Sequence, residues 1–177
     1  MPPCTRSTRD TSNSFQNIRS GTLELDSRLA EIAETEPYRE AVGWVRCFRG
    51  IDTLTAMLIL AELHDFRRFA SAPALMAYLG LVPGEDSSGE QHRRGRITRT
   101  GNALVRRLLV ETAWHYQHRP GIGVALTRRR KGQPGRVIAI ADKAQQRLCR
   151  RFRKLAAEHK PASKMAVAIA RELAGFL

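Results

Sequence analysis

Apolar residues recur every three to four positions along most of this chain, with polar residues between them. Leu25, Leu29 and Ile32 follow this spacing, and so do Leu148 and Phe152 farther along. The period is that of an α-helix with one buried face, and no segment alternates with period two for long enough to predict a strand. The pattern predicts an all-α fold, arranged as a helical bundle.

Prolines, glycines and short polar residues divide this pattern into elements. Ser71 is a suitable cap for one helix, and Thr100 or Asn102 can cap another. Pro37 and Pro161 stand where helices begin, since proline is tolerated in a first turn. Helices are expected at 23–36, 37–48, 53–63 and 71–81, and then on segments that begin after Thr100, after Pro134 and at Pro161.

Three regions follow from composition. Residues 1–20 are rich in Ser, Thr and Arg without any periodicity, and we predict a disordered tail. Residues 21–41 are predicted to be a helical linker. Residues 42–177 are long enough to form one domain with a hydrophobic core.

Two helices separated by Gly50-Ile51-Asp52 make the segment 42–56 resemble a helix-hairpin-helix. In that motif, backbone N–H groups of the turn contact a phosphate. Asp52 stands where a second glycine is usual, and its carboxylate would repel a phosphate or cap the next helix. A plain αα-hairpin is the alternative.

Charge is divided unevenly along the chain, whose net charge is +13. Residues 1–90 hold nine Lys and Arg against 13 Asp and Glu, and residues 91–177 hold 21 against four. Such an excess in one half is typical of a surface that faces a polyanion. The excess of basic residues therefore indicates a polyanionic partner, nucleic acid above all, but it does not identify a particular function.

The run from Pro83 to Arg107 is the strongest candidate site. A Gly- and Ser-rich loop, predicted for 83–95, leads into arginines with no acid after Glu90. Arginine forks match phosphate oxygens, and Ser87 and Ser88 offer hydroxyl groups beside them. The candidate phosphate-binding residues are Arg93, Arg94, Arg96, Arg99, Asn102, Arg106 and Arg107. A surface loop followed by a solvated basic helix is the competing interpretation.

Basic residues gather a second time at 147–154, where Arg147, Arg150, Arg151, Arg153 and Lys154 are spread widely around one predicted helix. Nucleic acid and solvent are equally good interpretations of this patch. No Cys or His spacing predicts a metal site. The three scattered cysteines and the absence of a long apolar run indicate a cytoplasmic protein with no membrane contact.

The motifs around this loop carry a family resemblance. An apolar hairpin, then LMAYLGLVP, then Ser-Ser-Gly, then RRGRIT-x-TGN-x-x-x-RR-x-L make residues 42–114 resemble the C-terminal domain of the insertion-sequence 110/116/902 transposase family. The helices up to residue 176 follow the family more loosely.

The resemblance implies a DNA recombinase guided by a structured RNA. In this family a serine in the matching loop attacks DNA and becomes linked to it, so Ser88, immediately before Gly89, is the expected nucleophile and Ser87 the fallback. The loop would then be a long catalytic loop between helices. The resemblance also suggests homo-oligomers or pairing with a full-length transposase.

Full-length family members carry an N-terminal RNase H-like domain whose acidic residues bind Mg²⁺. Residues 1–41 contain no such domain, so the chain is expected to hold no cofactor itself and to be a truncated member, inactive alone. Mg²⁺ is expected only together with that missing domain. A non-enzymatic nucleic-acid-binding module, or an inactive transposase fragment, is the alternative.

Overall fold

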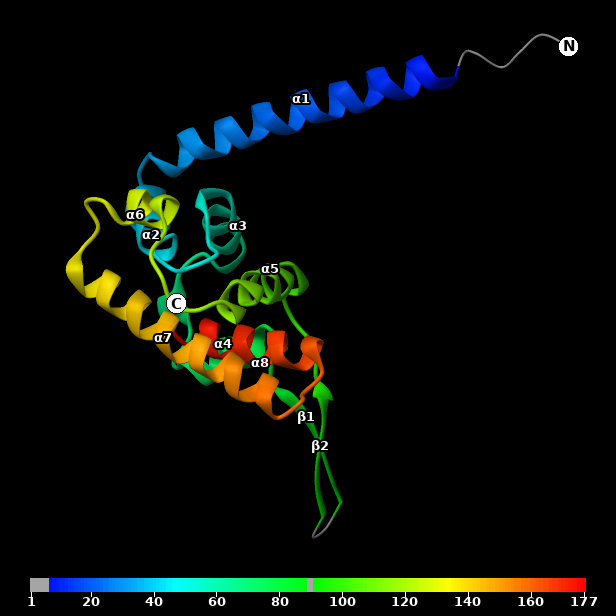
Figure 1. The fold of residues 1–177 in the computed structure, drawn as a ribbon, viewed down its shortest axis with the longest axis vertical. Coiled ribbons are helices and arrows are strands. Elements are labelled where there is room, and N and C mark those ends of the chain that lie inside the picture. Colours follow the sequence, from blue (N-terminus) through cyan, green and yellow to red (C-terminus); the bar gives the residue numbers. More distant parts are fainter. Residues whose placement is uncertain (1–6, 89–90) are drawn as a thin grey trace, which may run out of the picture.

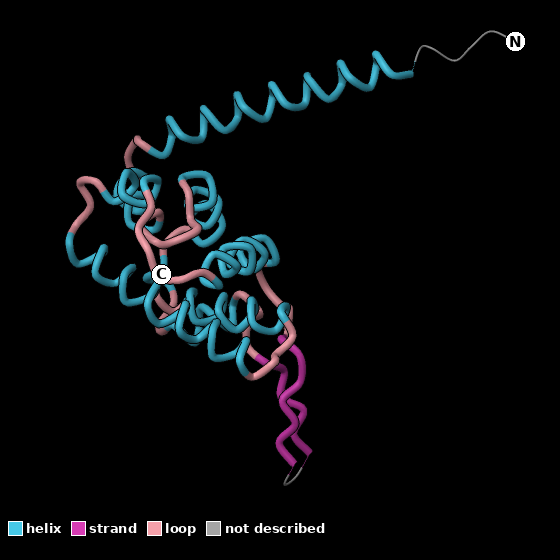
Figure 2. The backbone as a smooth tube through the Cα atoms, viewed as in Figure 1, coloured by secondary structure: helices cyan, strands magenta, loops and turns pink. Residues whose placement is uncertain are grey.

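A computed structural model describes residues 7–88 and 91–177. The described part of the chain forms helices and one β-hairpin, which confirms the all-α class (Figures 1 and 2). The elements are α1 (Ser7–Ala33), α2 (Tyr38–Val45), α3 (Thr53–Leu63), the 3₁₀ helix η1 (Phe66–Arg68), α4 (Ala72–Tyr78), β1 (Pro83–Ser88), β2 (Gln91–Ile97), α5 (Ala103–Ala113), the 3₁₀ helix η2 (Trp114–Gln117), α6 (Val124–Arg130), α7 (Gly135–Ala157) and α8 (Ala162–Ala174).

The core lies among α3, α5, α7 and α8, where the helical apolar spacing places side chains on one face of each helix. Helix α8 packs against both α5 and α7, and α3 reaches the core through α5. Ile59, Leu109, Leu148, Ile169 and Leu173 are fully buried there. Removing a leucine or isoleucine side chain from such a position typically costs about 2–5 kcal/mol. This core fixes the ends of α4 and α5, between which the hairpin emerges.

Helix α1 projects away from the helical body, and only its last turn reaches the core (Figure 1). Ala33 is buried, whereas the residues from 16 to 32 are exposed or half-buried. Residues 7–20 are helical, which differs from the disordered tail predicted for 1–20; residues 1–6 lie outside the described part. The stretch contains no Pro or Gly, and once a helix has begun each added residue gains one backbone hydrogen bond.

A two-stranded antiparallel sheet replaces the loop predicted for 83–95. Strand β1 pairs with β2 in the register Pro83↔Ile97, Glu85↔Arg94, Asp86↔Arg93, Ser87↔His92 and Ser88↔Gln91, with an irregularity between Pro83 and Glu85. The prediction of an irregular loop was wrong because both strands are polar on both faces. A hairpin that projects into solvent has no buried face, so it leaves no alternating apolar pattern to detect.

The predicted caps of two helices are confirmed. Ser71 Oγ accepts a hydrogen bond of 3.4 Å from the backbone N–H of Ala74, and Asn102 Oδ1 accepts one of 2.9 Å from Val105. Asp52, for which two roles were open, accepts a 2.8 Å bond from the N–H of Thr55. None of the described helices is both long enough and apolar enough to cross a lipid bilayer.

Candidate nucleic-acid interface

The β-hairpin leaves the body between α4 and α5, and its base is clamped by backbone contacts. The N–H of Thr98 donates to the carbonyl of Val82 at 2.9 Å, and that of Arg99 donates to Gly80 at 3.2 Å. The clamp depends on Gly101, which has a φ of +78° and lies so close to Tyr78 that a Cβ would overlap the Tyr78 carbonyl oxygen. The direction of the hairpin is therefore set by rigid elements on both sides.

Ser87, Ser88, Arg93 and Arg94 lie on the strands of this hairpin, toward the end that projects from the body (Figure 1). The structure describes their backbone, and their side chains lie outside the described part, as does Gly89. The register sets Glu85 opposite Arg94 and Asp86 opposite Arg93. Acidic residues therefore stand across the hairpin from two of the predicted phosphate-binding arginines, an arrangement that the linear sequence does not reveal.

Arg96 and Arg99 are exposed near the hairpin base. Neither forms an ion pair with any acid whose side chain the structure describes. Arg107 is also exposed, and its Nε lies 3.5 Å from the Glu111 carboxylate, one helical turn away. An exposed pair of this kind is worth about 0.3–0.5 kcal/mol, so its guanidinium is easily released to another anion. These three arginines are open to a phosphate.

Asn102 and Arg106, in contrast, hold the protein together. The Asn102 amide donates from Nδ2 to Glu62 Oε2 at 2.6 Å while its Oδ1 caps α5. Arg106 Nη1 donates to the carbonyls of Leu79 at 2.9 Å and Thr100 at 3.2 Å. Both side chains join α5 to the preceding elements, and nucleic acid would reach the Asn102 amide only by displacing Glu62.

An aromatic and cationic cluster lies beside the hairpin base, and sequence reasoning missed it. The Arg68 guanidinium stands 4.8 Å from the Phe69 ring centroid and 4.9 Å from that of Tyr78, and the two rings lie 5.2 Å apart. Tyr78 is 36% exposed, and its carbonyl accepts a bond from the N–H of Asn102. Such stacks are typical of surfaces that receive nucleobases. No local pattern of residues reveals the cluster, because η1 and α4 must first fold together.

The turn between α2 and α3 is better described as an αα-hairpin than as a phosphate-binding motif. The Asp52 carboxylate occupies the position at the start of α3 where an anion would bind. A nearby pocket of about 300 Å³ is lined by Arg49, His115 and Arg129, among others. Arg49 donates to the carbonyl of Arg119, and Arg129 donates to that of Arg46. Both arginines therefore join the segment around the turn to the residues near α6.

Buried polar groups elsewhere are poor nucleophiles. Burial raises the pKa of the Cys47 thiol, although Arg130 opposes the shift. Burial likewise raises the pKa of the Cys149 thiol, with Arg49 opposing, and the pKa of the Tyr116 hydroxyl. All three groups stay protonated at neutral pH. Among residues 7–88 and 91–177, as far as side chains are described, no three His, Cys, Asp or Glu residues gather as metal ligands would.

Comparisons with known proteins match this region. Residues 45–125, which contain the hairpin and its base, match the model of the Transposase IS116/IS110/IS902 family. The y4qE protein of Sinorhizobium fredii, named as a transposase, is 45% identical over 153 residues, covering 86% of this chain and 39% of that protein.

Two further relatives are named for mobile elements. The transposase for insertion sequence element IS1533 of Leptospira borgpetersenii is 41% identical over 139 residues, covering 77% of this chain and 40% of its own length. The transposase for IS1111A of Coxiella burnetii is 35% identical over 69 residues, covering 39% of this chain and 19% of that protein. The chain thus spans about two fifths of the length of the first two relatives.

Proposed function

We propose that this chain, whose residues 45–125 match the model of the Transposase IS116/IS110/IS902 family, acts in DNA transposition. It would bind DNA and supply a serine nucleophile for cutting and rejoining a strand. Ser88 is the proposed nucleophile and Ser87 the fallback. The observation that carries this proposal is that the family match contains the whole hairpin, serines included, together with the arginines at its base.

The shape of the hairpin and the exposed arginines near it support binding to DNA. A two-stranded β-ribbon fits the major groove of B-DNA, and this one projects clear of the helical body (Figure 2). Arg96 and Arg99 are exposed at its base, and Arg107 is exposed on α5, the helix that follows the hairpin. Bidentate pairing with phosphate oxygens would position the strand without reading its bases.

The proposed chemistry is a transfer of one phosphodiester bond. Ser88 Oγ attacks the phosphorus atom, a new Oγ–P bond forms, and the bond from phosphorus to one sugar oxygen breaks. The hydroxyl proton of the serine passes to a base, and the leaving sugar oxygen takes up a proton. One DNA end is then linked to the protein, and attack by a free sugar hydroxyl on that link reverses the step and rejoins a strand. Arginine charge would stabilise the phosphate as its charge builds up.

The base and any Mg²⁺ are proposed to come from outside this chain. Carboxylates in a close group are the ligands that Mg²⁺ prefers, and the described side chains offer no such group. We therefore assign no step of the reaction to a metal held here. An acidic domain of a full-length transposase, acting with a guide RNA, is the proposed source.

We also propose that α1 pairs with a helix of a second copy of this chain or of that full-length transposase. Ile18, Leu25 and Ile32 recur at intervals of seven on α1 and are 67%, 61% and 43% exposed. A seven-residue apolar repeat favours pairing with another helix. Sedimentation of the chain and of Leu25→Glu would test this, with loss of an oligomer expected in the variant.

A covalent adduct tests the enzymatic proposal. The chain is mixed with labelled duplex DNA, guide RNA and a full-length relative whose own matching serine has been replaced, and adducts are separated by size on a denaturing gel. An adduct at the size of this chain is expected, lost in Ser88→Ala and kept in Ser87→Ala. Loss in Ser87→Ala alone would move the role to the fallback serine.

An adduct that survives both substitutions would refute the serine assignment. DNA binding with no adduct under any complementation would instead favour a non-enzymatic binding module.

A further inference from the structure

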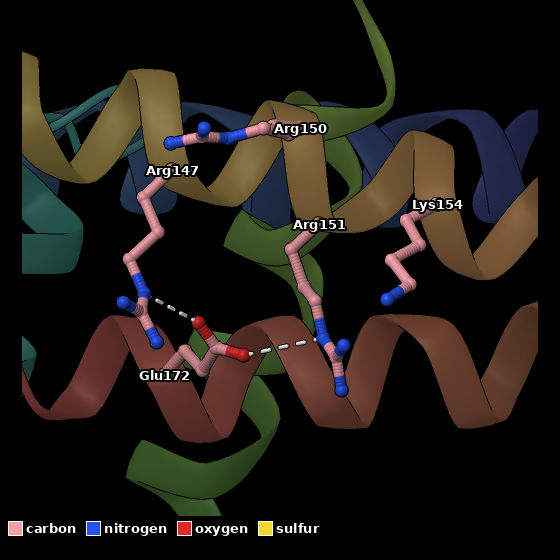
Figure 3. Close-up of a pocket in the computed structure, with 5 residues that line it drawn as sticks. All are labelled: Arg147, Arg150, Arg151, Lys154 and Glu172. Atoms are coloured by element: carbon pink, nitrogen blue, oxygen red, sulfur yellow. Dashed lines mark hydrogen bonds and ion pairs between the residues drawn. The ribbon is translucent and has the colours of Figure 1, made fainter.

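Helices α7 and α8 enclose a second basic site. Arg147, Arg150, Arg151 and Lys154 of α7 and Glu172 of α8 line an open hollow of about 420 Å³ (Figure 3). We call it the α7–α8 groove. The sequence alone spreads these cations too widely for a single target. The structure corrects this: positions 147, 151 and 154 lie at helical intervals of four and three, so they share one face of α7.

Glu172 organises the groove and only partly neutralises it. Its carboxylate lies 2.9 Å from Arg147 Nε and 3.4 Å from Arg151 Nε, so it bridges two guanidinium groups (Figure 3). The Glu172 side chain is 24% exposed, whereas those of Arg147 and Arg151 are 60% and 42% exposed. The bridge uses one edge of each guanidinium, and the remaining donors of both arginines can meet a ligand.

The remaining cations of the groove, Arg150 and Lys154, have no ion pair with any acid in the part of the chain whose side chains are described. Four cations and one carboxylate therefore line a single hollow. Holding like charges this close is unfavourable unless an anion joins them. Arg153, the other cation of this stretch, is placed differently, because its Nε lies 3.4 Å from the carbonyl oxygen of Cys149.

The arrangement fits a row of phosphates better than one small anion. From Arg147 to Lys154 the cations extend over about 10 Å of helix, given a rise of about 1.5 Å per residue. That length suits successive phosphates on one strand. Among the described residues that line the groove there is no aromatic ring, and the one carboxylate, Glu172, is already engaged by two arginines. Recognition of single-stranded RNA commonly uses stacking of bases on aromatic rings, which this lining does not provide.

We propose that the α7–α8 groove binds the phosphate backbone of duplex DNA, away from the reacting serine, and does so without reading sequence. The inference rests on the proposed function, because it takes the substrate of the hairpin to be DNA. Glu172 acts as a built-in competitor that keeps Arg147 and Arg151 extended until phosphates take its place.

Binding of the 177-residue chain to a labelled DNA duplex at several salt concentrations tests the groove. Binding is followed as the slope of the logarithm of the association constant against the logarithm of the salt concentration. Replacing Arg147, Arg151 and Lys154 together by Gln should make this slope shallower by about 3, at about 0.9 for each phosphate that the variant no longer neutralises. The matched control replaces Arg19, Arg28 and Arg39, which are exposed on α1 and α2, and removes the same charge. The control should change the slope far less.

Glu172→Gln provides the opposite test, because it should tighten DNA binding and steepen the salt dependence. Its control is Glu24→Gln, which makes the same charge change and breaks an exposed pair with Arg28 on α1. Because an unfolded chain of net charge +13 can also bind DNA, circular dichroism and a cooperative thermal transition must show that both variants are folded before their binding is compared. Equal effects of Glu172→Gln and Glu24→Gln would overturn the proposal, and so would equal effects of the two triple variants.

The same titration separates this inference from the proposed function. Absence of DNA binding by the unaltered chain would defeat both. If DNA binding weakened in Arg96→Gln but stayed unchanged in every groove variant, the groove proposal would be refuted and the proposed function would stand. The last measurement uses a duplex RNA of the same sequence. If the groove substitutions weakened binding to RNA more than binding to DNA, the assignment of the groove to DNA would be wrong.

Discussion

Asn102 Nδ2 donates a 2.6 Å hydrogen bond to Glu62 Oε2, which ties the first residue before α5 to the end of α3. The other atom of the same amide, Oδ1, caps α5 through the N–H of Val105. One side chain thus fixes the helix that follows the hairpin in two directions. The direction in which the hairpin projects depends on this junction.

Asn102→Ala should destabilise the fold by about 1 kcal/mol through loss of the cap. Urea unfolding measures the change. Asn102→Ser is the matched variant, since serine also caps helices, and it should recover most of the loss without restoring the bond to Glu62. The salt dependence of DNA binding should stay unchanged in both. Unaltered stability together with weaker DNA binding would instead make Asn102 a direct contact.

Gly101→Ala should destabilise the protein by about 2–4 kcal/mol. The φ of +78° disfavours a side chain, and a Cβ would overlap the Tyr78 carbonyl oxygen, which is backbone and cannot move aside alone. Gly121→Ala is the control, because a Cβ there meets no atom within 4 Å, and it should stay within about 0.5 kcal/mol of the unaltered chain. Thermal unfolding of the two variants, measured side by side, decides the point. Equal midpoints would contradict a tight clamp at the hairpin base.

Arg96→Gln and Arg106→Gln should separate phosphate binding from structural support. Arg96 is exposed, so its replacement should change the free energy of unfolding by less than about 0.5 kcal/mol. The log–log slope of DNA binding against salt concentration should become shallower by about 1. Arg106 donates to two backbone carbonyls, so its replacement should cost about 2 kcal/mol and leave the salt dependence nearly unchanged. The reverse pattern would show that Arg106 is the phosphate contact and Arg96 is not.

The elements that sequence predicts well are those whose signal is local. The caps at Ser71 and Asn102 depend on residues three positions apart, and the buried faces of α3 and α7 repeat every turn. The hairpin escaped prediction because Pro83 to Ile97 carries no apolar face for a period of two to reveal. Its backbone pairing, rather than burial, defines it.

The candidate site was predicted in part for the same reason. Clustering of arginines in sequence identified Arg96, Arg99 and Arg107, which are exposed. It also selected Arg106, whose partners Leu79 and Thr100 can be named only once α4 lies beside α5. Glu172 is 25 residues from Arg147, so the bridge that draws the basic residues of α7 into one groove depends on the packing of α7 on α8.

Stability should fall as pH rises above about 8.5, the ordinary pKa of a cysteine thiol. Burial raises the pKa of the Cys47 and Cys149 thiols in the folded protein. Above about pH 8.5 the unfolded chain therefore loses these protons first, and the folded state binds more protons than the unfolded one. The stabilisation that these thiols contribute is then complete below that pH and is lost as pH rises toward their folded pKa.

Urea unfolding under reducing conditions at about pH 7 and about pH 9.5 measures this fall. The double variant Cys47→Ala/Cys149→Ala is the control, and its stability should fall less between the two pH values, because it lacks both thiols. The buried Tyr116 hydroxyl, whose pKa is also raised, contributes in both proteins at the high end. Alanine leaves a small cavity at each site, so the comparison uses the change with pH within each protein and not the absolute stabilities. An identical fall in both proteins would mean that the two thiols titrate in the folded protein as they do in the unfolded chain, and would contradict their burial in the folded protein.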